Sequence, residues 1–441
     1  MSNPIPKTYT PLKFVIVGAG LGGLAAAIGL RLSGHHVIML EQAPELGEVG
    51  AGIQIPPNST KILDALGVRE PLLAVSHVPK SYNFRKWDSG DLLSYLVLRP
   101  YCLEQYGAPY LHIHRADFHK VLVDRAVEVG VVIKLGARVM RVAFDDNSVI
   151  TGDGRQFNAD VILGADGLKS QIRQTMLGRP DPPHNTGDIA WRALVRSSEV
   201  RKHEDLKFIW EEPKINFWWG PKIHVVVYLL NSNSGETVNI VVLSPDTLPQ
   251  DVNVEPAQPG EILDLFSDWD PKLKKLLTLV HQTSKWRLQN SIEMETWVHE
   301  TGNVALMGDA CHATLPYLAQ GAAQAVEDSA VLTGLFGRIT DKSQIHGLLK
   351  TYENLRKWRT TQVVQGSTNC RDIFHLPDGE KQAKRDALLK LSPRKGYPNR
   401  WADPVFQKFL FGYDAFKEAE RGWNSFVAHE PVTFVDNSLK L

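Results

Sequence analysis

A glycine-rich turn near the N-terminus constrains the fold more than any other feature of the sequence. The segment KFVIVGAG is an apolar strand that runs into glycines, and LGGLAAAIGLRLSG has the composition of a helix ended by Gly34. A second apolar strand, HHVIMLE, follows at once. Because strands and helices that alternate in this way form βαβ units, the pattern predicts an α/β protein built on a Rossmann-type domain.

The turn contains Gly18, Gly20 and Gly23 in the pattern G-x-G-x-x-G, and Glu41 lies eighteen residues after Gly23. Glycine permits the tight turn and the close approach of a pyrophosphate, which the first N–H groups of the helix then bind. A carboxylate at the end of the next strand accepts hydrogen bonds from ribose hydroxyls. The pattern predicts a dinucleotide site, with NAD and FAD as alternative ligands. The other interpretation is a glycine-rich turn that binds no ligand.

The overall charge and the cysteines argue against several classes of function. Lys plus Arg and Asp plus Glu both number 49, so no net field attracts nucleic acid or an anionic membrane. The three cysteines lack the spacing of a zinc site and the number of a disulfide framework. The uncharged stretch 14–30 contains five glycines and is short for a membrane span. We expect a cytoplasmic protein without metal, nucleic-acid partner or membrane span.

Three further segments carry a resemblance to a known family. ILGADGLKSQIR contains Asp166, Gly167, Ser170 and Arg173 in the pattern D-G-x-x-S-x-x-R, ALMGDACHATLPYLAQGAAQAVED contains a Gly-Asp motif, and HRADFHKVL places Arg115 near a helix start. Together these segments resemble the flavoprotein aromatic hydroxylases, and most of all salicylate hydroxylase and its relatives. The resemblance implies FAD as the cofactor, NADH or NADPH as a transient reductant, and a fold like that of p-hydroxybenzoate hydroxylase.

That fold implies a division of the chain. Segments rich in β-branched and aromatic residues between Asp188 and Trp297 predict an antiparallel sheet, and the chain from Ala322 onward is largely helical in composition. We expect a Rossmann-type FAD-binding domain with an inserted antiparallel substrate domain and a helical C-terminal region. The expected ranges are 1–78, 108–184 and 291–345 for the FAD-binding domain, 79–107 and 185–290 for the substrate domain, and 346–441 for the helical region.

The resemblance also assigns cofactor-binding roles. It implies that Glu41 holds the adenosine ribose, that Arg115 approaches the pyrophosphate, and that Asp309 bonds a ribityl hydroxyl. The loop at Asp166 would take part in binding both FAD and the pyridine nucleotide. Taken singly, Asp309 could instead cap a helix, Asp166 could belong to an ordinary turn, and Arg115 could be a solvated charge.

A second group of residues is expected around the isoalloxazine ring. A helix that begins at Gly321, Ala322 and Ala323 would present free N–H groups and the positive end of its dipole to the anionic reduced ring. Pro316 matches a proline that the family places beside the flavin. His312 is expected near the flavin, is not assigned as the catalytic base, and keeps an open role.

Substrate ligands are expected on the antiparallel sheet. AWRALV places Arg192 on a strand, and HVVVYLL places His224 and Tyr228 four residues apart, so on one face of a strand. Related hydroxylases carry an arginine and a tyrosine in corresponding strands, which makes Arg192 and Tyr228 the expected ligands of a phenolate or carboxylate. His224 could relay a proton. A purely structural role is the alternative for each, and also for the aromatic residues that could wall an aryl pocket, Trp210, Phe217, Trp218 and Trp219.

These features predict an FAD-dependent monooxygenase that uses NAD(P)H and O2 to hydroxylate a small phenol. Salicylate, converted to catechol with loss of CO2, is the leading substrate, and hydroxylation or dearomatisation of a larger phenolic or indole natural product is the alternative. A protein that binds FAD without hydroxylase activity is a second alternative, and a nucleophilic enzyme centred on Cys311 and its neighbour His312 is a third. A homodimer is expected from the type of fold, and the sequence does not select between NADH and NADPH.

Overall fold

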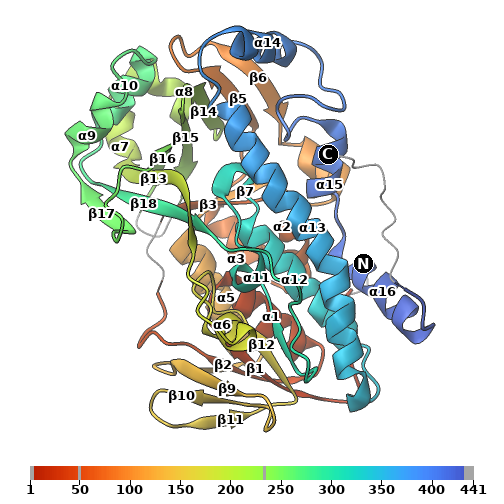
Figure 1. Cartoon of the computed structure of the whole chain (residues 1–441). Coiled ribbons are helices and arrows are strands. Elements are labelled where there is room, and N and C mark those ends of the chain that lie inside the picture. The colour runs from red at the N-terminus through yellow and green to blue at the C-terminus, as the bar shows by residue number, and fades with distance from the viewer. Residues whose placement is uncertain (1–3, 48–50, 232–234, 432–441) are drawn as a thin grey trace.

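The computed structural model describes residues 4–47, 51–231 and 235–431, and two main sheets with surrounding helices form its framework (Figure 1). The first sheet is parallel and corresponds to the Rossmann-type unit. Its strands are β1 (Lys13–Val17), β2 (His36–Leu40), β8 (Val132–Lys134), β12 (Val161–Gly164) and β19 (Val304–Leu306). In space they follow the order β19-β12-β1-β2-β8, so β1 lies at the centre with a neighbour on each side.

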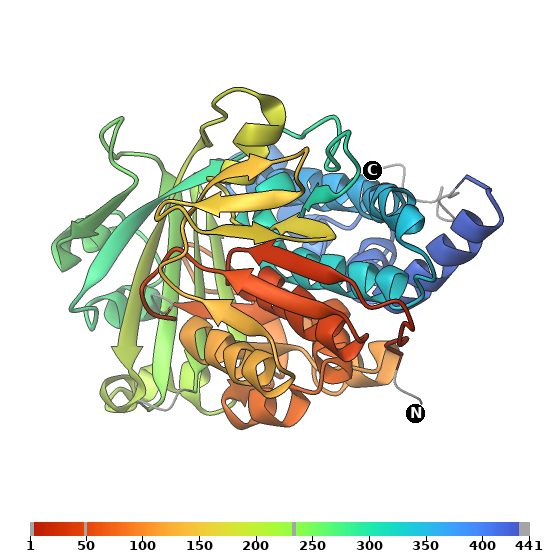
Figure 2. The ribbon, with the colours of Figure 1, turned by 90° about the horizontal axis from the view of Figure 1, so that it is seen from below.

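Different elements cover the two faces of the parallel sheet. A three-stranded antiparallel meander stacks over one face, and helices pack against the other, as Figure 2 shows from below. The meander consists of β9 (Val139–Ala143), β10 (Ser148–Thr151) and β11 (Gln156–Asn158). The helices on the other face include α1 (Leu21–Leu32), α5 (Arg115–Glu128) and α12 (Gly321–Phe336).

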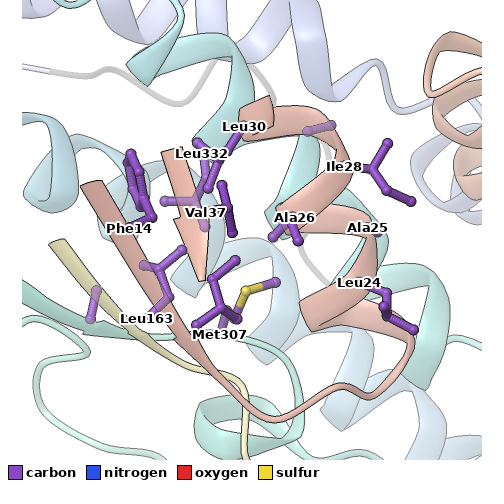
Figure 3. Packing of buried hydrophobic residues seen from close by; sticks show 14 of the residues in the cluster. Phe14, Leu24, Ala25, Ala26, Ile28, Leu30, Val37, Leu163, Met307 and Leu332 are labelled. Carbon is purple, nitrogen blue, oxygen red and sulfur yellow. The ribbon is translucent and has the colours of Figure 1, made fainter. Parts of the chain in front are cut away.

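Small residues let α1 and α12 approach each other closely. An added Cβ at Gly29 would lie 2.1 Å from Thr333 Oγ1, and one at Gly22 would lie 2.7 Å from Ala325 Cβ. Apolar side chains fill the space between these helices and the strands, as Figure 3 shows around Leu332. The glycine- and alanine-rich composition of both helices therefore serves packing, and it brings the N-terminus of α12 close to the glycine turn before α1.

The second sheet is larger and mostly antiparallel. In chain order its strands are β5 (Ser81–Lys86), β6 (Leu92–Val97), β13 (His184–Arg196), β14 (Ile215–Gly220), β15 (Ile223–Leu230), β16 (Thr237–Pro245), β17 (Val254–Ala257) and β18 (Thr283–Asn290). Their spatial order is β17-β18-β13-β16-β15-β14-β5-β6, with β14 and β5 running parallel. Alternate residues of β14 face opposite sides, because Phe217 and Trp219 join one buried cluster and Trp218 joins another.

One face of this sheet looks toward the rest of the molecule, and small elements join it to the parallel sheet. A short antiparallel sheet of β3 (Gly52–Ile55), β4 (Ser76–His77) and β7 (Leu111–His114) lies between the two main sheets. The long helix α13 (Ile345–Phe374) then runs the length of the molecule beside α12 (Figure 1). It leads into α14 (Glu380–Leu389), α15 (Pro404–Phe411) and α16 (Ala415–Val427), as the predicted helical C-terminal region requires.

A buried network of charges joins α12 to α13. Glu327 accepts hydrogen bonds from Arg356 Nη1 at 2.6 Å and from Arg359 Nε at 2.7 Å. Asp328 accepts one from Arg356 Nε at 2.7 Å. The side chains of Glu327, Asp328 and Arg356 are fully buried, so each charge depends on its partners for the solvation that water no longer supplies. Asn58 on the helix α2 (Pro57–Ala65) also donates to Glu327, at 2.6 Å.

The observed elements agree with the expected α/β core, inserted sheet and helical end, while the expected domain limits stay a prediction. No helix among residues 4–47, 51–231 and 235–431 has the length and apolarity needed to cross a bilayer.

We expect Glu327→Ala to destabilise the protein by about 3–5 kcal/mol, because it leaves two buried guanidinium groups without their shared carboxylate. Chemical denaturation followed by circular dichroism measures the loss. Asp124→Ala is the matched control, since Asp124 forms an exposed pair with Lys120 within one helix and such pairs contribute about 0.3–0.5 kcal/mol. A loss below about 1 kcal/mol in Glu327→Ala would mean that the network is not needed for stability.

Candidate active site

A cavity of about 440 Å³ opens between the parallel sheet and the large antiparallel sheet. Elements far apart in the chain line it. The parallel-sheet side contributes the glycine turn and the loops around Gly167 and Asp309, and the antiparallel sheet contributes residues from β13, β14, β15 and β16. The predicted site residues on its lining are Gly20, Gly23, Arg115, Arg192, His224, Tyr228, Asp309, Pro316, Gly321 and Ala322.

The glycines of the turn have different physical roles. Gly18 has φ +103°, and a Cβ there would lie 2.4 Å from the carbonyl oxygen of Ala165. A Cβ at Gly23 would lie 2.3 Å from the carbonyl oxygen of Gly18. Gly20 differs, because an added Cβ meets no described atom within 4 Å and the residue lines the cavity. Gly18 and Gly23 therefore allow the backbone to pack, whereas Gly20 leaves room for a ligand.

Glu41 holds the glycine turn in place. Its Oε2 accepts a hydrogen bond from the backbone N–H of Ala19 at 2.8 Å, and its Oε1 accepts one from Ala43 at 2.9 Å. A carboxylate that bonds the turn directly is well placed at the end of β2, next to the N-terminus of α1. Glu41 is not one of the described residues that line the cavity, and its contact with a ribose stays a prediction.

The carboxylate of Asp309 is available to a ligand. Asp309 begins the short helix α11 (Asp309–His312), is exposed and lines the cavity. It makes no side-chain hydrogen bond to any residue in the described part of the chain, although the neighbouring backbone N–H of Gly308 is held by Asp328 at 2.9 Å. A fixed backbone that presents a free carboxylate fits a hydrogen bond to a sugar-alcohol hydroxyl such as that of the ribityl chain.

Asp166 has a structural role next to the cavity. Its Oδ1 accepts from Ser170 Oγ at 2.6 Å, and its Oδ2 accepts from the backbone of Gln171 at 2.7 Å, so Asp166 caps the start of α6 (Gln171–Leu177). The neighbouring Gly167 lines the cavity, whereas Asp166 is not on the described lining. The alternative expectation, that Asp166 belongs to an ordinary turn, accounts for these contacts.

The buried Arg173 of the same motif joins two loops. Its Nη1 donates to the carbonyl oxygen of Ala310 at 3.1 Å and its Nη2 to that of Leu168 at 2.8 Å. A salt bridge to Asp181, with Nε to Oδ2 at 2.9 Å, completes its contacts. The motif therefore ties the Asp166 loop to the loop that presents Asp309.

The N-terminus of α12 faces the cavity, as expected. Gly321 and Ala322 line it, whereas Ala323 is buried in packing and is not on the described lining. Gln320, the residue before the helix, has its Oε1 bonded to Asn58 and Gln324, so its side chain does not cap the first turn. The first N–H groups of α12 are left to interact with a ligand.

His312 and Cys311 do not take part in the cavity. His312 is buried, and its Nε2 lies 2.6 Å from Asp328 Oδ2. The helical turn of α11 points its side chain toward α12, and the expectation that His312 lies near the flavin stays a prediction. The Cys311 thiol contacts the carbonyl oxygen of Gly308 at 3.5 Å, and burial raises its pKa. A protonated, buried thiol does not support the alternative of a nucleophilic cysteine enzyme.

Arg192 presents a positive charge to the other end of the cavity. Its guanidinium carbon lies 5.3 Å from the ring centroid of Trp286, and within the described chain it pairs with no carboxylate. Burial, followed by the charge of Arg115, lowers its pKa, while Tyr228 acts in the opposite direction. Burial keeps the Tyr228 pKa above 10, so its hydroxyl is protonated at neutral pH. A cation without a counter-ion beside a phenol is a ready site for an anion.

His224 belongs to a histidine pair that the sequence did not indicate. Its Nδ1 lies 2.7 Å from Nε2 of His375, which follows the end of α13. Burial lowers the pKa of His224 well below 6.5 and that of His375 to about 4, so both rings are neutral at pH 7. His224 lines the cavity and His375 is partly exposed, so the pair joins the cavity to the surface.

Other cavity residues also escaped the sequence analysis. Gln54 comes from β3, Tyr317 from the turn after Pro316, and Trp401 from the C-terminal region. Tyr317 donates to Asp188 at 2.7 Å, and this bond joins the turn to β13. Of the four aromatic residues considered for an aryl wall, Phe217 lines the cavity and the remaining three do not. Trp401 could have been noticed in the sequence as a large aromatic residue in an otherwise polar segment. No feature of the sequence around Gln54 indicated that it would line the cavity.

Comparison with known proteins assigns the fold and the glycine turn to a family. Residues 12–367 match the family described as FAD binding domain. The chain belongs to this family. A dinucleotide needs a close approach to the backbone and acceptors for its hydroxyl groups, and the open space at Gly20 and the free carboxylate of Asp309 fit these needs; their contacts with FAD stay a prediction.

Relatives in the family are oxygenases. FAD-dependent monooxygenase OpS4 of Beauveria bassiana (strain ARSEF 2860) is 38% identical over 417 residues, covering 93% of this chain and 97% of the relative. The 6-hydroxynicotinate 3-monooxygenase of Pseudomonas fluorescens is 34% identical over 406 residues, covering 92% and 95%. A solved salicylate hydroxylase substrate complex superimposes with a TM-score of 0.77 at 27% identity, covering 94% and 98%. The predicted FAD-dependent aromatic hydroxylase, its cofactor and its p-hydroxybenzoate hydroxylase-like fold are confirmed.

We expect Gly20→Ala to reduce the amount of FAD that copurifies with the protein, without lowering the thermal stability of the FAD-free form. The new methyl group meets no atom of the protein within 4 Å but enters the cavity where the backbone should approach the pyrophosphate. Gly260→Ala is the control, because a Cβ there also meets nothing within 4 Å and lies outside the cavity lining. If Gly20→Ala retained its full FAD content, the glycine turn would not be needed for cofactor binding.

The histidine pair makes stability depend on pH below the ordinary histidine range. The folded pKa values are lowered, so the unfolded chain takes up protons first, and stability falls as pH drops from 6.5 toward about 4. His375→Gln removes one such proton and should reduce this slope by up to about 1.4 kcal/mol per pH unit. Denaturation curves over this range test it, with exposed His281→Gln as the control. An unchanged slope in His375→Gln would contradict the burial of a neutral ring.

Proposed function

We propose that this FAD-dependent enzyme uses NAD(P)H and O2 to hydroxylate a small phenolic acid, with salicylate as the first candidate and catechol, CO2 and water as the products. The observation that carries the proposal is Arg192, a cation without a carboxylate partner in the described chain, beside Tyr228 and His224 in the cavity that the FAD cradle also lines. A carboxylate or phenolate would supply the missing counter-charge.

The residues of the cavity have distinct parts in this reaction. Arg192 and Tyr228 bind the anionic oxygen and orient the ring. His224 is neutral at pH 7, so a ring nitrogen can accept a hydrogen bond from the phenolic hydroxyl and increase the electron density on the ring. Phe217 and Trp401 exclude water from the reacting carbon. Reduced FAD, when bound, would activate O2, which supplies the oxygen atom that enters the ring.

Two further features favour a small acid over a large phenol. The cavity is shared between the cofactor cradle and the substrate, which favours a small substrate. The relatives named for 6-hydroxynicotinate and the salicylate hydroxylase complex also act on or bind small acids, according to their names. A larger phenolic or indole natural product remains the competing substrate class, and a homodimer is the expected assembly.

The test measures NADH and NADPH oxidation by the FAD-loaded protein with salicylate, 6-hydroxynicotinate and phenol, and identifies the products by mass spectrometry. We expect an acid to stimulate oxidation and to yield a hydroxylated product, with catechol and CO2 in equal amounts if salicylate is the substrate. Oxidation that gives only hydrogen peroxide with every compound would indicate an FAD-binding protein without hydroxylase activity.

Replacing Arg192 by alanine should raise KM for the acid by about tenfold to a hundredfold, the usual effect of losing a hydrogen bond to a charged group. FAD content should not change, because the residue faces the substrate end of the cavity. Arg196→Ala is a matched control on the same strand, exposed and outside the described lining. If the kinetics of Arg192→Ala were unchanged, Arg192 would not be a substrate ligand.

A further inference from the structure

The contact between His224 and His375 is fixed by the backbone as well as by the two rings. Nδ1 of His224 lies 2.7 Å from Nε2 of His375. The backbone carbonyl of His375 accepts a hydrogen bond from the N–H of Lys222 at 3.2 Å, and its own N–H donates to the carbonyl of Arg371 at 3.0 Å. Lys222 lies in the turn between β14 and β15, two residues before His224. The end of α13 and the start of β15 are therefore held together beside the two rings.

The two rings cross the wall of the cavity. His224 is buried and lines the cavity together with Phe217 and Tyr317, whose ring centroids lie 6.3 and 5.3 Å from its own. The ring of Phe374 packs edge-on against His224 with a centroid distance of 5.5 Å. His375 is not on the described lining, and its residue is partly exposed. The inner histidine is therefore packed among aromatic rings, and the outer one reaches the surface.

Neither ring of the pair forms a salt bridge within residues 4–47, 51–231 and 235–431. Acidic side chains on the neighbouring elements pair with Arg371 instead. Asp188 of β13 has its Oδ2 3.6 Å from Nη1 of Arg371, and Asp372 of α13 has its Oδ1 3.0 Å from Nε of the same guanidinium. The positive charge of Arg371 also acts against protonation of His375. No carboxylate therefore holds a proton on this pair.

A second buried histidine shows the opposite arrangement. Nε2 of His312 lies 2.6 Å from Oδ2 of Asp328, and both side chains are buried. A carboxylate in direct contact favours the charged form of an imidazole, so a proton on His312 would be retained. The pair of His224 and His375 has another imidazole in the place of that carboxylate. A proton that enters at one end of it is passed on and not retained.

Two neutral imidazoles in contact share one hydrogen, which either ring nitrogen can carry. When Nδ1 of His224 carries it, Nε2 of His224 is left as an acceptor for a group in the cavity, and Nδ1 of His375 carries a hydrogen. A phenolic O–H that gives its proton to Nε2 of His224 then moves the shared hydrogen to Nε2 of His375. The hydrogen on Nδ1 of His375 leaves to solvent. For each O–H or N–H bond that breaks, another forms, and neither ring keeps a charge.

We propose that His375 is a relay residue for the reaction, which acts through His224 to pass the phenolic proton of the substrate from the cavity to solvent. His375 does not touch the substrate, so it positions and empties His224 and is not itself a catalytic residue. The inference rests on the proposed function for the phenolic nature of the substrate. It adds a route by which the hydroxyl ionises inside the cavity, and an ionised oxygen makes the ring a stronger nucleophile.

A pH jump with the FAD-loaded protein and the probe 5-nitrosalicylate tests the relay without turnover. The phenol of this acid changes its visible absorbance on ionisation, so stopped-flow mixing from neutral to mildly alkaline pH measures how fast the bound phenol loses its proton. We expect His375→Ala to slow this step about tenfold or more, the usual scale for removing a proton-transfer group. Affinity for the probe and FAD content should change little, because Arg192 and Tyr228 are retained.

Chemical rescue separates a relay from a structural role. Added imidazole should restore the rate in His375→Ala, because the position is partly exposed, but not in His375→Phe, where a ring fills the space. His375→Gln keeps a polar side chain that does not pass protons, so it should be as slow as His375→Ala. His281→Gln removes an exposed histidine elsewhere and should ionise the probe at the wild-type rate.

The proposal is overturned by a wild-type rate in His375→Ala, by a wild-type rate in His375→Gln, by a slow step that imidazole does not restore, or by a wild-type protein that does not ionise the bound probe. If the probe ionises in the expected pattern and no acid is hydroxylated with NAD(P)H and O2, the proposed function fails and the relay stands. If acids are hydroxylated and ionisation does not depend on His375, the reverse holds.

Discussion

The buried charges between α12 and α13 are the interaction on which the arrangement of the site depends. Asp328 bonds the backbone N–H of Gly308, His312 and Arg356, while Glu327 bonds Arg356, Arg359 and Asn58. One network therefore fixes the loop that presents Asp309, the position of α12 and the C-terminal helix. Because an unpaired charge in this place would be very costly, the loop has little freedom to move away from the cofactor. The site is built on a rigid support.

The cavity combines two kinds of recognition. At the parallel-sheet end, backbone N–H groups, a glycine without neighbours and a free carboxylate fit a dinucleotide that is long and rich in hydroxyls and phosphates. At the other end, Arg192, Tyr228, His224 and Gln54 line the cavity together with aromatic side chains. The relatives have the dinucleotide end of the cavity in common, because it belongs to the family fold. Differences among their substrates are expected at the other end of the cavity. The two sheets thus contribute different parts of the cavity lining.

Sequence reasoning selected residues that line the cavity where their position follows from local structure. Gly20 and Asp309 lie in short motifs whose backbone conformation presents them to a ligand, and Arg192 and Tyr228 follow from strand alternation. It did not foresee the contact of His312, because a short helical turn directs that side chain toward Asp328, which lies 16 residues further along the chain. It assigned Asp166 a part in cofactor binding, which stays a prediction, and did not foresee that the carboxylate bonds the backbone at the start of α6. In both cases a neighbouring helix decided the direction of the side chain.

The sequence by itself determined the Rossmann-type unit, the FAD family and the faces of the strands, because glycine spacing and alternation act over a few residues. Only the tertiary structure decided which distant side chains meet. His224 pairs with His375 across 151 residues, and Gln54 contacts Tyr82 and Tyr110 from a separate strand. No local pattern encodes such pairs, because the periodicity of a strand specifies which residues share a face but not which strand or helix lies opposite. The set of polar side chains at the substrate end of the cavity is therefore determined by the folded chain and not by any local segment.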